Sequence, residues 1–140
     1  MRILVIDDEE DIVVELGSFL RRRGHEAAGA GSVGAALRAL GVRGPFDVVL
    51  TDLCMPDGSG LDMLRACAAL PAPQPVTLLM SGHADASHFA MARTLGAFGV
   101  FPKPVPLRSL LQTLKDIEGA RPGEPAPHRI MSAAGAARSG

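Results

Sequence analysis

The sequence of 140 residues has no tryptophan, no tyrosine and only two cysteines. Cys54 and Cys67 are too few for a disulfide framework or a cysteine-based metal site. No apolar run approaches the roughly 20 residues that span a bilayer, and no signal-peptide pattern precedes the first strand-like run. A net charge of −1 gives no bulk attraction to nucleic acid or to a membrane surface. We therefore expect a cytoplasmic protein that neither binds nucleic acid directly nor enters a membrane.

Lysine is also scarce, because only Lys103 and Lys115 are lysines among the 14 basic residues. Lys103 stands between Pro102 and Pro104. The rarity of lysine and the two flanking prolines favour a specific role for Lys103 over that of an ordinary solvated residue. A glycine-rich phosphate loop is absent after the first strand-like run, which argues against nucleotide binding.

The sequence does contain enough apolar residues, 47% of the total, for one domain with a full core. Short apolar runs alternate along the chain with stretches of helical periodicity. We predict strands over residues 2–6, 25–31, 48–52, 76–80 and 99–102, and a helix after each of them. Such alternation predicts a doubly wound α/β fold, with a parallel sheet covered by helices on both faces.

Two segments need separate comment. The strand over 25–31 is poor in large residues, which favours an edge position or close packing by its neighbours. Ser32 is expected to cap the following helix, whose inner face is predicted to carry Val33, Ala36, Leu37 and Leu40. Residues 119–140 lose apolar periodicity and are interpreted as a flexible tail or linker, with a short helix over 128–137 as the alternative.

Chemically useful residues follow four of the predicted strands. Asp7 and Asp8 follow the first, Asp52 ends the central one, Ser81 follows the fourth and Lys103 the fifth. The carboxyl ends of parallel strands emerge at one edge of the sheet, where open α/β sheets bind ligands. Three carboxylates held together need a cation, and oxygen ligands suit Mg²⁺. With Lys103 and Ser81 they form an electrophilic setting in which Asp52 is a nucleophile for phosphoryl transfer.

The alternative for the acidic run of residues 7–11 is that all five carboxylates only favour the N-terminus of the first helix. Asp11 is assigned to the first turn of that helix. Asp57 is interpreted as a loop residue, in the break that Pro56, Gly58 and Gly60 predict after the central strand.

Taken together, these features resemble the receiver domain of bacterial two-component response regulators. The matching features are Asp7-Asp8, Asp52 followed by Met55-Pro56 and Gly60, Ser81-Gly82, and Lys103-Pro104. The resemblance covers residues 2 to about 118, so we expect a receiver domain over 1–118. It implies a flavodoxin-like (βα)5 fold with strand order 2-1-3-4-5.

The resemblance also implies a ligand set and roles for the site. Asp8, Asp52 and the backbone carbonyl of Cys54 are expected to bind Mg²⁺ directly, and Asp7 to position the metal. Asp52 is expected to be the phosphoacceptor. Lys103 is expected to pair with the phosphoryl oxygens.

Ser81 is expected to move toward the modified Asp52, and the peptide bond between Lys103 and Pro104 is expected to be cis. His83, two residues beyond Ser81, carries the hypothesis that it affects the lifetime of the phosphoryl group. Cys54, two residues beyond Asp52, is expected to tune the access of water.

The implied function is a signalling switch that catalyses only its own phosphorylation and dephosphorylation. The implied partners are a sensor histidine kinase or histidine phosphotransfer protein and a downstream protein. A homodimer is expected to use the face of the fourth helix, fifth strand and fifth helix.

One position departs from the family pattern, because Val100 stands where the family often has an aromatic residue. Phe101 is expected to point to the opposite face of the sheet. Signalling then relies on Ser81 and the loop before the fourth helix, or on the dimer face. A module that works without phosphorylation is the alternative function. A metal-dependent phosphohydrolase is disfavoured, because Cys54 stands where such an enzyme needs a second acid.

Overall fold

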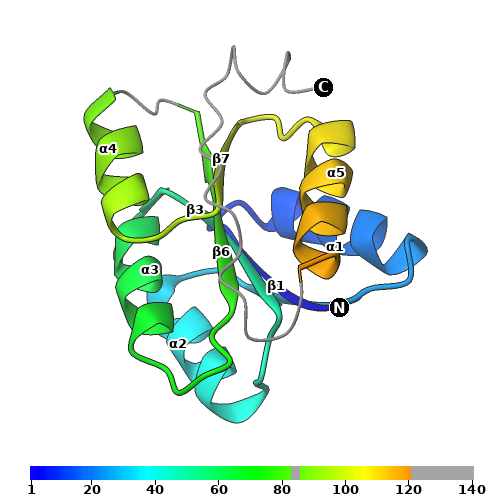
Figure 1. Ribbon diagram of the computed structural model, residues 1–140, viewed down its shortest axis with the longest axis horizontal. Helices are drawn as coiled ribbons and strands as arrows, with labels where there is room; N and C mark the ends of the chain where they lie inside the picture. The colour runs from blue at the N-terminus through cyan, green and yellow to red at the C-terminus, as the bar shows by residue number, and fades with distance from the viewer. Residues whose placement is uncertain (83–85, 121–140) are drawn as a thin grey trace.

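A five-stranded parallel sheet forms the centre of the computed structural model, which describes residues 1–82 and 86–120 (Figure 1). Its strands are β1 (Arg2–Ile6), β2 (Glu26–Ala30), β3 (Val48–Asp52), β6 (Val76–Ser81) and β7 (Gly99–Pro102). They lie in the order β2-β1-β3-β6-β7, and every neighbouring pair is parallel. This is the predicted order 2-1-3-4-5, since the labels β4 and β5 belong to two short strands outside the sheet.

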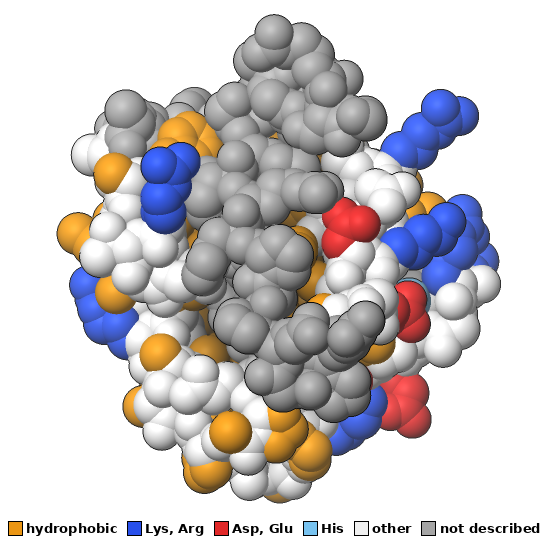
Figure 2. All heavy atoms as spheres, in the orientation of Figure 1, with side chains coloured by type: hydrophobic (Ala, Val, Ile, Leu, Met, Phe, Trp, Pro, Cys, Tyr) orange, Lys and Arg blue, Asp and Glu red, His pale blue; other side chains and the backbone are white. Residues whose placement is uncertain are grey.

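Helices cover both faces of the sheet, as the predicted doubly wound fold requires. They are α1 (Glu10–Arg22), α2 (Val33–Val42), α3 (Gly60–Ala68), α4 (Ala86–Thr94) and α5 (Leu107–Glu118). Helices α1 and α5 lie on one side of the sheet and α2, α3 and α4 on the other (Figure 1). On the face drawn in Figure 2, acidic and basic side chains lie near one another on the side of the molecule that carries α1 and α5.

The central strand β3 is buried along its whole length. Its alternating side chains join different apolar clusters, because successive residues of a strand point to opposite faces. Val48 and Leu50 pack with residues of α1 and α5, whereas Val49 packs with residues of α2 and α3. The continuous apolar run therefore marks a strand covered on both faces, which places the end of β3 between its two neighbours β1 and β6.

The loop predicted after the central strand contains a small hairpin that the sequence interpretation missed. Strands β4 (Cys54–Met55) and β5 (Gly58–Ser59) pair antiparallel, with two residues between them. Ser59 then begins α3 with a capping box, in which its side chain accepts from the backbone N–H of Leu61 and Asp62 accepts from that of Ser59. The loop that was predicted between the central strand and α3 is thus a hairpin with its own hydrogen bonds.

Helix α2 begins as predicted but faces the core differently. The Ser32 side chain accepts a hydrogen bond of 3.0 Å from the backbone N–H of Ala35, so the predicted cap is confirmed. Leu37, however, is 46% exposed, and the prediction that it lies on the inner face is wrong. Val33 and Ala36 are buried and Leu40 packs against the same apolar cluster, as predicted, and Ala39 is buried as well. Because two of these side chains are small, the helix lies close to the sheet with Leu37 turned outward.

Strand β2 lies at the edge of the sheet and packs closely, as its small residues predicted. A Cβ atom at Gly29 would collide with the side chain of Val13 on α1. Within residues 1–82 and 86–120, no helix has the length and apolar character needed to cross a membrane. His83, the start of the fourth predicted helix and the tail over 121–140, with its alternative helix over 128–137, lie outside the described residues.

Candidate functional site

The site is built at the carboxyl edge of the sheet, where neighbouring parallel strands end side by side. Asp52 is the last residue of β3 and Asp7 comes directly after β1, which pairs with β3. Ser81 ends β6 on the other side of β3, and its register partner Pro102 in β7 directly precedes Lys103. The alternation of strands and helices in the sequence therefore brings these four segments to one place.

Three carboxylates converge at this edge. Asp7, Asp8 and Asp52 each offer one oxygen atom, and these oxygens all lie within 4.8 Å of one another. Asp7 is fully buried and Asp52 is 6% exposed, whereas Asp8 is exposed to solvent. Such an arrangement of like charges is unfavourable without a counter-charge. The arrangement therefore needs cations close by.

Lys103 supplies one of these cations. Its Nζ atom lies 2.9 Å from Oδ2 of Asp7 and 3.2 Å from Oδ2 of Asp52. Burial by itself would lower the pKa of the ammonium group. The close carboxylates of Asp7 and Asp52 outweigh burial and raise the pKa of Lys103. The site thus holds a fixed positive charge beside Asp52.

The ion pair with Lys103 does not fully compensate Asp52. Burial, followed by the charge of Asp7, raises the pKa of the Asp52 carboxyl above its ordinary value. The charge of Lys103 and a hydrogen bond from the backbone N–H of Cys54 act in the opposite direction but are weaker. The folded protein therefore disfavours the ionised form of Asp52, chiefly because the carboxyl group is buried.

One buried oxygen indicates where a second cation fits. Oδ2 of Asp7 faces the charge of Lys103 but makes no hydrogen bond of good geometry. The other oxygen of Asp7, Oδ1, accepts a hydrogen bond of 2.9 Å from the backbone N–H of Glu9. Carboxylate oxygens are the ligands that a hard divalent cation prefers, and Oδ2 of Asp7 has a lone pair without a hydrogen bond. Because Asp8 is exposed to solvent, a cation bound here could also keep some of its water ligands. The residues present therefore fit Mg²⁺.

A fourth carboxylate was not singled out by the sequence interpretation. Oε1 of Glu9 lies 3.5 Å from Nζ of Lys103, although the two residues are 94 positions apart. In the sequence, the only indication that Glu9 belongs to this site is its position directly after Asp7 and Asp8. The interpretation placed Asp7 and Asp8 at the strand end and Asp11 in the first turn of the helix, and it gave Glu9 no separate role.

A family model described as the response regulator receiver domain matches residues 3–115. The chain belongs to this family. Response regulator protein PilR of Pseudomonas aeruginosa is 37% identical over 110 residues, which are 78% of this chain and 24% of that protein. Transcriptional regulatory protein KdpE of Mycobacterium tuberculosis is 36% identical over 114 residues, which are 81% of this chain and 49% of that protein. The chain thus spans about a quarter to a half of these relatives.

Solved structures give the same assignment. A receiver protein from Pseudomonas putida matches with a TM-score of 0.76 and 30% identity, covering 81% of this chain and 94% of that chain. A receiver domain from Clostridium thermocellum matches with a TM-score of 0.75 and 33% identity, covering 83% of this chain and 92% of that one. The fold and the two-component family of the chain are therefore established, and receiver domains are signalling switches.

Ser81 stands at the end of β6, as expected, whereas Cys54 begins the short strand β4. Ser81 is buried, with 6% exposure, and its backbone carbonyl accepts a hydrogen bond of 3.0 Å from the N–H of Lys103. Cys54 is exposed and carries a free thiol. The peptide bond between Lys103 and Pro104 is cis, as predicted. The roles of Ser81 and of the Cys54 carbonyl remain predictions.

Asp57, which the sequence interpretation left out of the metal site, forms hydrogen bonds with the start of α2. Its two carboxylate oxygens accept hydrogen bonds of 3.0 and 3.1 Å from the backbone N–H groups of Val33 and Gly34. These bonds lower the pKa of Asp57. Asp57 therefore ties the β4–β5 hairpin to the N-terminus of α2.

Val100, which stands where the family often has an aromatic residue, and its neighbour Phe101 face opposite sides of the sheet, as predicted. Val100 packs with residues of α3 and α4, and Phe101 packs with residues of α1 and α5. Both side chains are buried, with 3% and 0% exposure. This receiver domain therefore has no aromatic ring at position 100, on the face of the sheet that packs against α4.

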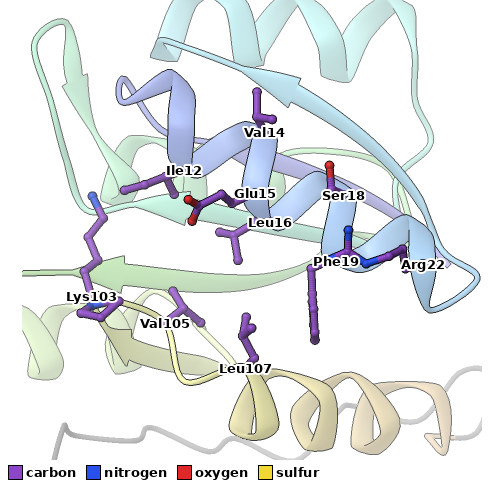
Figure 3. A pocket seen from close by; sticks show the side chains of 11 residues that line it. Ile12, Val14, Glu15, Leu16, Ser18, Phe19, Arg22, Lys103, Val105 and Leu107 are labelled. Atoms are coloured by element: carbon purple, nitrogen blue, oxygen red, sulfur yellow. The ribbon is translucent and has the colours of Figure 1, made fainter.

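A groove of about 520 Å³ opens between α1 and the start of α5, next to the site. Figure 3 shows Leu16 and Phe19 of α1 opposite Val105 and Leu107, with Lys103 at one end and Arg22 at the other. Lys103 therefore lines this groove as well as facing the carboxylates of Asp7 and Asp52.

Proposed function

We propose that this receiver domain accepts a phosphoryl group on Asp52 and changes its binding of a downstream protein as a result. The observation that carries this proposal is the position of the Asp52 carboxylate, 3.2 Å from Nζ of Lys103 and within reach of Asp7 and Asp8. The proposed donor is a histidine kinase or a histidine phosphotransfer protein in the cytoplasm.

In the proposed reaction an oxygen of Asp52 attacks the phosphorus atom of a phosphohistidine. The new P–O bond forms as the P–N bond breaks, and the imidazole leaves with the electron pair and takes a proton. The high pKa of Lys103 keeps its ammonium group charged at neutral pH, so it can pair with the phosphoryl oxygens as they lose their former partner. The hydroxyl group of Ser81 would donate a hydrogen bond to the same oxygens.

Asp8, Asp52 and the carbonyl of Cys54 would hold the metal, with Asp7 positioning it. When bound, Mg²⁺ would neutralise the carboxylates and stabilise negative charge on the phosphoryl oxygens. The convergence of three carboxylates near a single ammonium group supports this assignment, and so does Oδ2 of Asp7, which accepts no hydrogen bond of good geometry.

A second candidate function is a receiver-fold interaction module that works without phosphorylation. The observation that favours it is Val100, which fills its apolar cluster without an aromatic ring. The acidic cluster and its pairing with Lys103 favour the first proposal, since a module of this kind needs neither.

In the phosphorylated switch, a shift of α4, β7 and α5 would alter partner binding, and a homodimer would use the same face.

Incubation with acetyl phosphate and Mg²⁺, followed by intact-mass and peptide mass spectrometry, tests the two functions. We expect one added phosphoryl group at Asp52, none in Asp52→Asn, and none when EDTA removes the metal. A folded protein that binds Mg²⁺ but takes up no phosphate would support the interaction module and reject the switch.

A further inference from the structure

Glu9 is the outermost of three carboxylates that surround the Lys103 ammonium group. The distances from Nζ are 2.9 Å to Asp7, 3.2 Å to Asp52 and 3.5 Å to Glu9. The exposed fractions of the three side chains rise in the same order, from 0% to 8% to 65%. The carboxylate of Glu9 therefore stands at the solvent side of the site, while the other two form its floor.

Glu9 does not perform the usual task of a polar residue at its position. It is the N-cap residue of α1, yet its side chain makes no hydrogen bond to the first turn of that helix. Its backbone is fixed by the N–H bond to Oδ1 of Asp7, and its side chain reaches the ammonium group of Lys103 instead. The carboxylate is thus directed toward the phosphorylation site and not toward the helix.

From this geometry, and resting on the proposed function, we infer that Glu9 is a specificity-determining residue that discriminates among phosphoryl donors by their charge. A free anionic donor that approaches Asp52 must come close to the Glu9 carboxylate. The same carboxylate also competes with the incoming phosphoryl oxygens for the ammonium group of Lys103. A protein donor can offset both effects by placing a cation against Glu9, which a small anion cannot do.

The size of the effect follows from elementary electrostatics. Two unit charges a few ångströms apart in a largely aqueous setting change a rate by about three- to tenfold. Dissolved salt screens exposed charges over about 8 Å at physiological ionic strength. The effect of Glu9 should therefore shrink as salt is added, because its side chain is mostly exposed.

Two small donors of different charge test the inference. In each, an oxygen of Asp52 forms a bond to phosphorus, and either acetate leaves from acetyl phosphate or ammonia leaves from phosphoramidate. Acetyl phosphate is a dianion at neutral pH and phosphoramidate is largely a monoanion. Initial rates are measured by intact-mass spectrometry at saturating Mg²⁺, because the chain has no tryptophan or tyrosine to report phosphorylation by fluorescence.

We expect Glu9→Gln to speed phosphorylation by acetyl phosphate about three- to tenfold, and by phosphoramidate less, with both gains reduced at high salt. Glu10→Gln is the matched control, since it removes the same charge from the next exposed residue and should change the rates less than about twofold. Glu9→Asp keeps the charge and should retain the ranking of donors seen in the unmodified protein.

Two outcomes would overturn the inference. One is an equal change for both donors, or a slower rate with both, which would mean that Glu9 only positions Lys103. The other is an effect of Glu10→Gln as large as that of Glu9→Gln, which would mean that only net charge matters. If the unmodified protein itself takes up no phosphate at Asp52 from either donor, the proposed function fails instead.

Discussion

At the scale of single residues, the site keeps a charge that the fold would be more stable without. Asp52 is buried next to Asp7, and its raised pKa means that the folded state disfavours the ionised form. Lys103 only partly compensates this cost. Active sites commonly retain such strain because their function needs it.

Removing the charge of Asp52 should therefore stabilise the metal-free protein. We expect Asp52→Asn to raise the free energy of unfolding by roughly 0.5–2 kcal/mol in EDTA, measured by urea denaturation followed by circular dichroism. The gain should shrink or reverse when Mg²⁺ is added, since the ion stabilises the folded form that retains its ligand. Glu10→Gln, which removes an exposed carboxylate, should change stability by less than about 0.5 kcal/mol.

His25 provides a residue-scale prediction far from the proposed phosphorylation site. Burial, followed by the amino group of Met1, holds the pKa of His25 below its ordinary value of 6.5, against a smaller opposing effect of Glu118. The ring nitrogen Nδ1 lies 3.1 Å from that amino group. The unfolded chain therefore binds a proton at His25 more readily than the folded chain, and stability must fall as the pH drops below 6.5.

Replacement of His25 by glutamine should remove this part of the pH dependence. We expect the melting temperature of His25→Gln to decline less than that of the unmodified protein between about pH 7.5 and pH 5.5. Thermal unfolding followed by circular dichroism measures both declines. Equal declines in the two proteins would show that His25 titrates alike in the folded and unfolded states.

At the scale of elements, the start of α2 depends on a residue that lies 24 positions further along the chain. Asp57 accepts two backbone hydrogen bonds from the first turn of α2, while Ser32 accepts a third. Asp57 also belongs to the connection that follows Asp52. The hairpin next to the proposed phosphorylation site and the N-terminus of α2 therefore form one unit.

Loss of the Asp57 carboxylate should loosen this unit. We expect Asp57→Ala to lower the free energy of unfolding, because the backbone N–H groups of Val33 and Gly34 lose their acceptor at the start of α2. Hydrogen exchange at the amides of Val33 and Gly34 should quicken. Asp57→Asn, which keeps one acceptor oxygen, should give a smaller loss.

Amides in the middle of α1 serve as an internal reference for that exchange experiment. Their exchange should change only as far as global stability falls. If the amides at the start of α2 are no more affected than those of α1, Asp57 does not hold the two elements together.

At the scale of the whole molecule, the described apolar core is formed by the five sheet strands, the five helices and a few residues of their connections. The buried members of the three apolar clusters run from Ile3 to Leu114. Helix α5 ends at Glu118, and Gly119 follows as its C-cap. We therefore propose that residues 1–118 fold as the receiver domain and that residues 119–140 are a tail or linker.

A shortened chain tests this proposal directly. A protein that ends after Ala120 should melt within about 2 °C of the full chain and bind Mg²⁺ with the same affinity. Differential scanning calorimetry and a Mg²⁺ titration give the two quantities. A drop in melting temperature of more than about 5 °C would show that residues beyond 120 stabilise the folded domain.

The sequence by itself determined which segments form the five strands of the sheet and which residues stand at the ends of these strands, although it did not indicate the β4–β5 hairpin. Apolar runs and helical periods are local patterns, so β1, β3 and β7 lie close to their predicted bounds. Parallel pairing then brings Asp7, Asp52 and Lys103 to one edge without further information.

Only the tertiary structure decided which partners each side chain meets. The pairing of Glu9 with Lys103, the bonds from Val33 and Gly34 to Asp57, and the outward position of Leu37 depend on how the helices settle on the sheet. The physical reason is that a local pattern fixes the face of an element, whereas a contact between distant residues also requires the relative placement of two elements. That placement is set by close packing of the whole core.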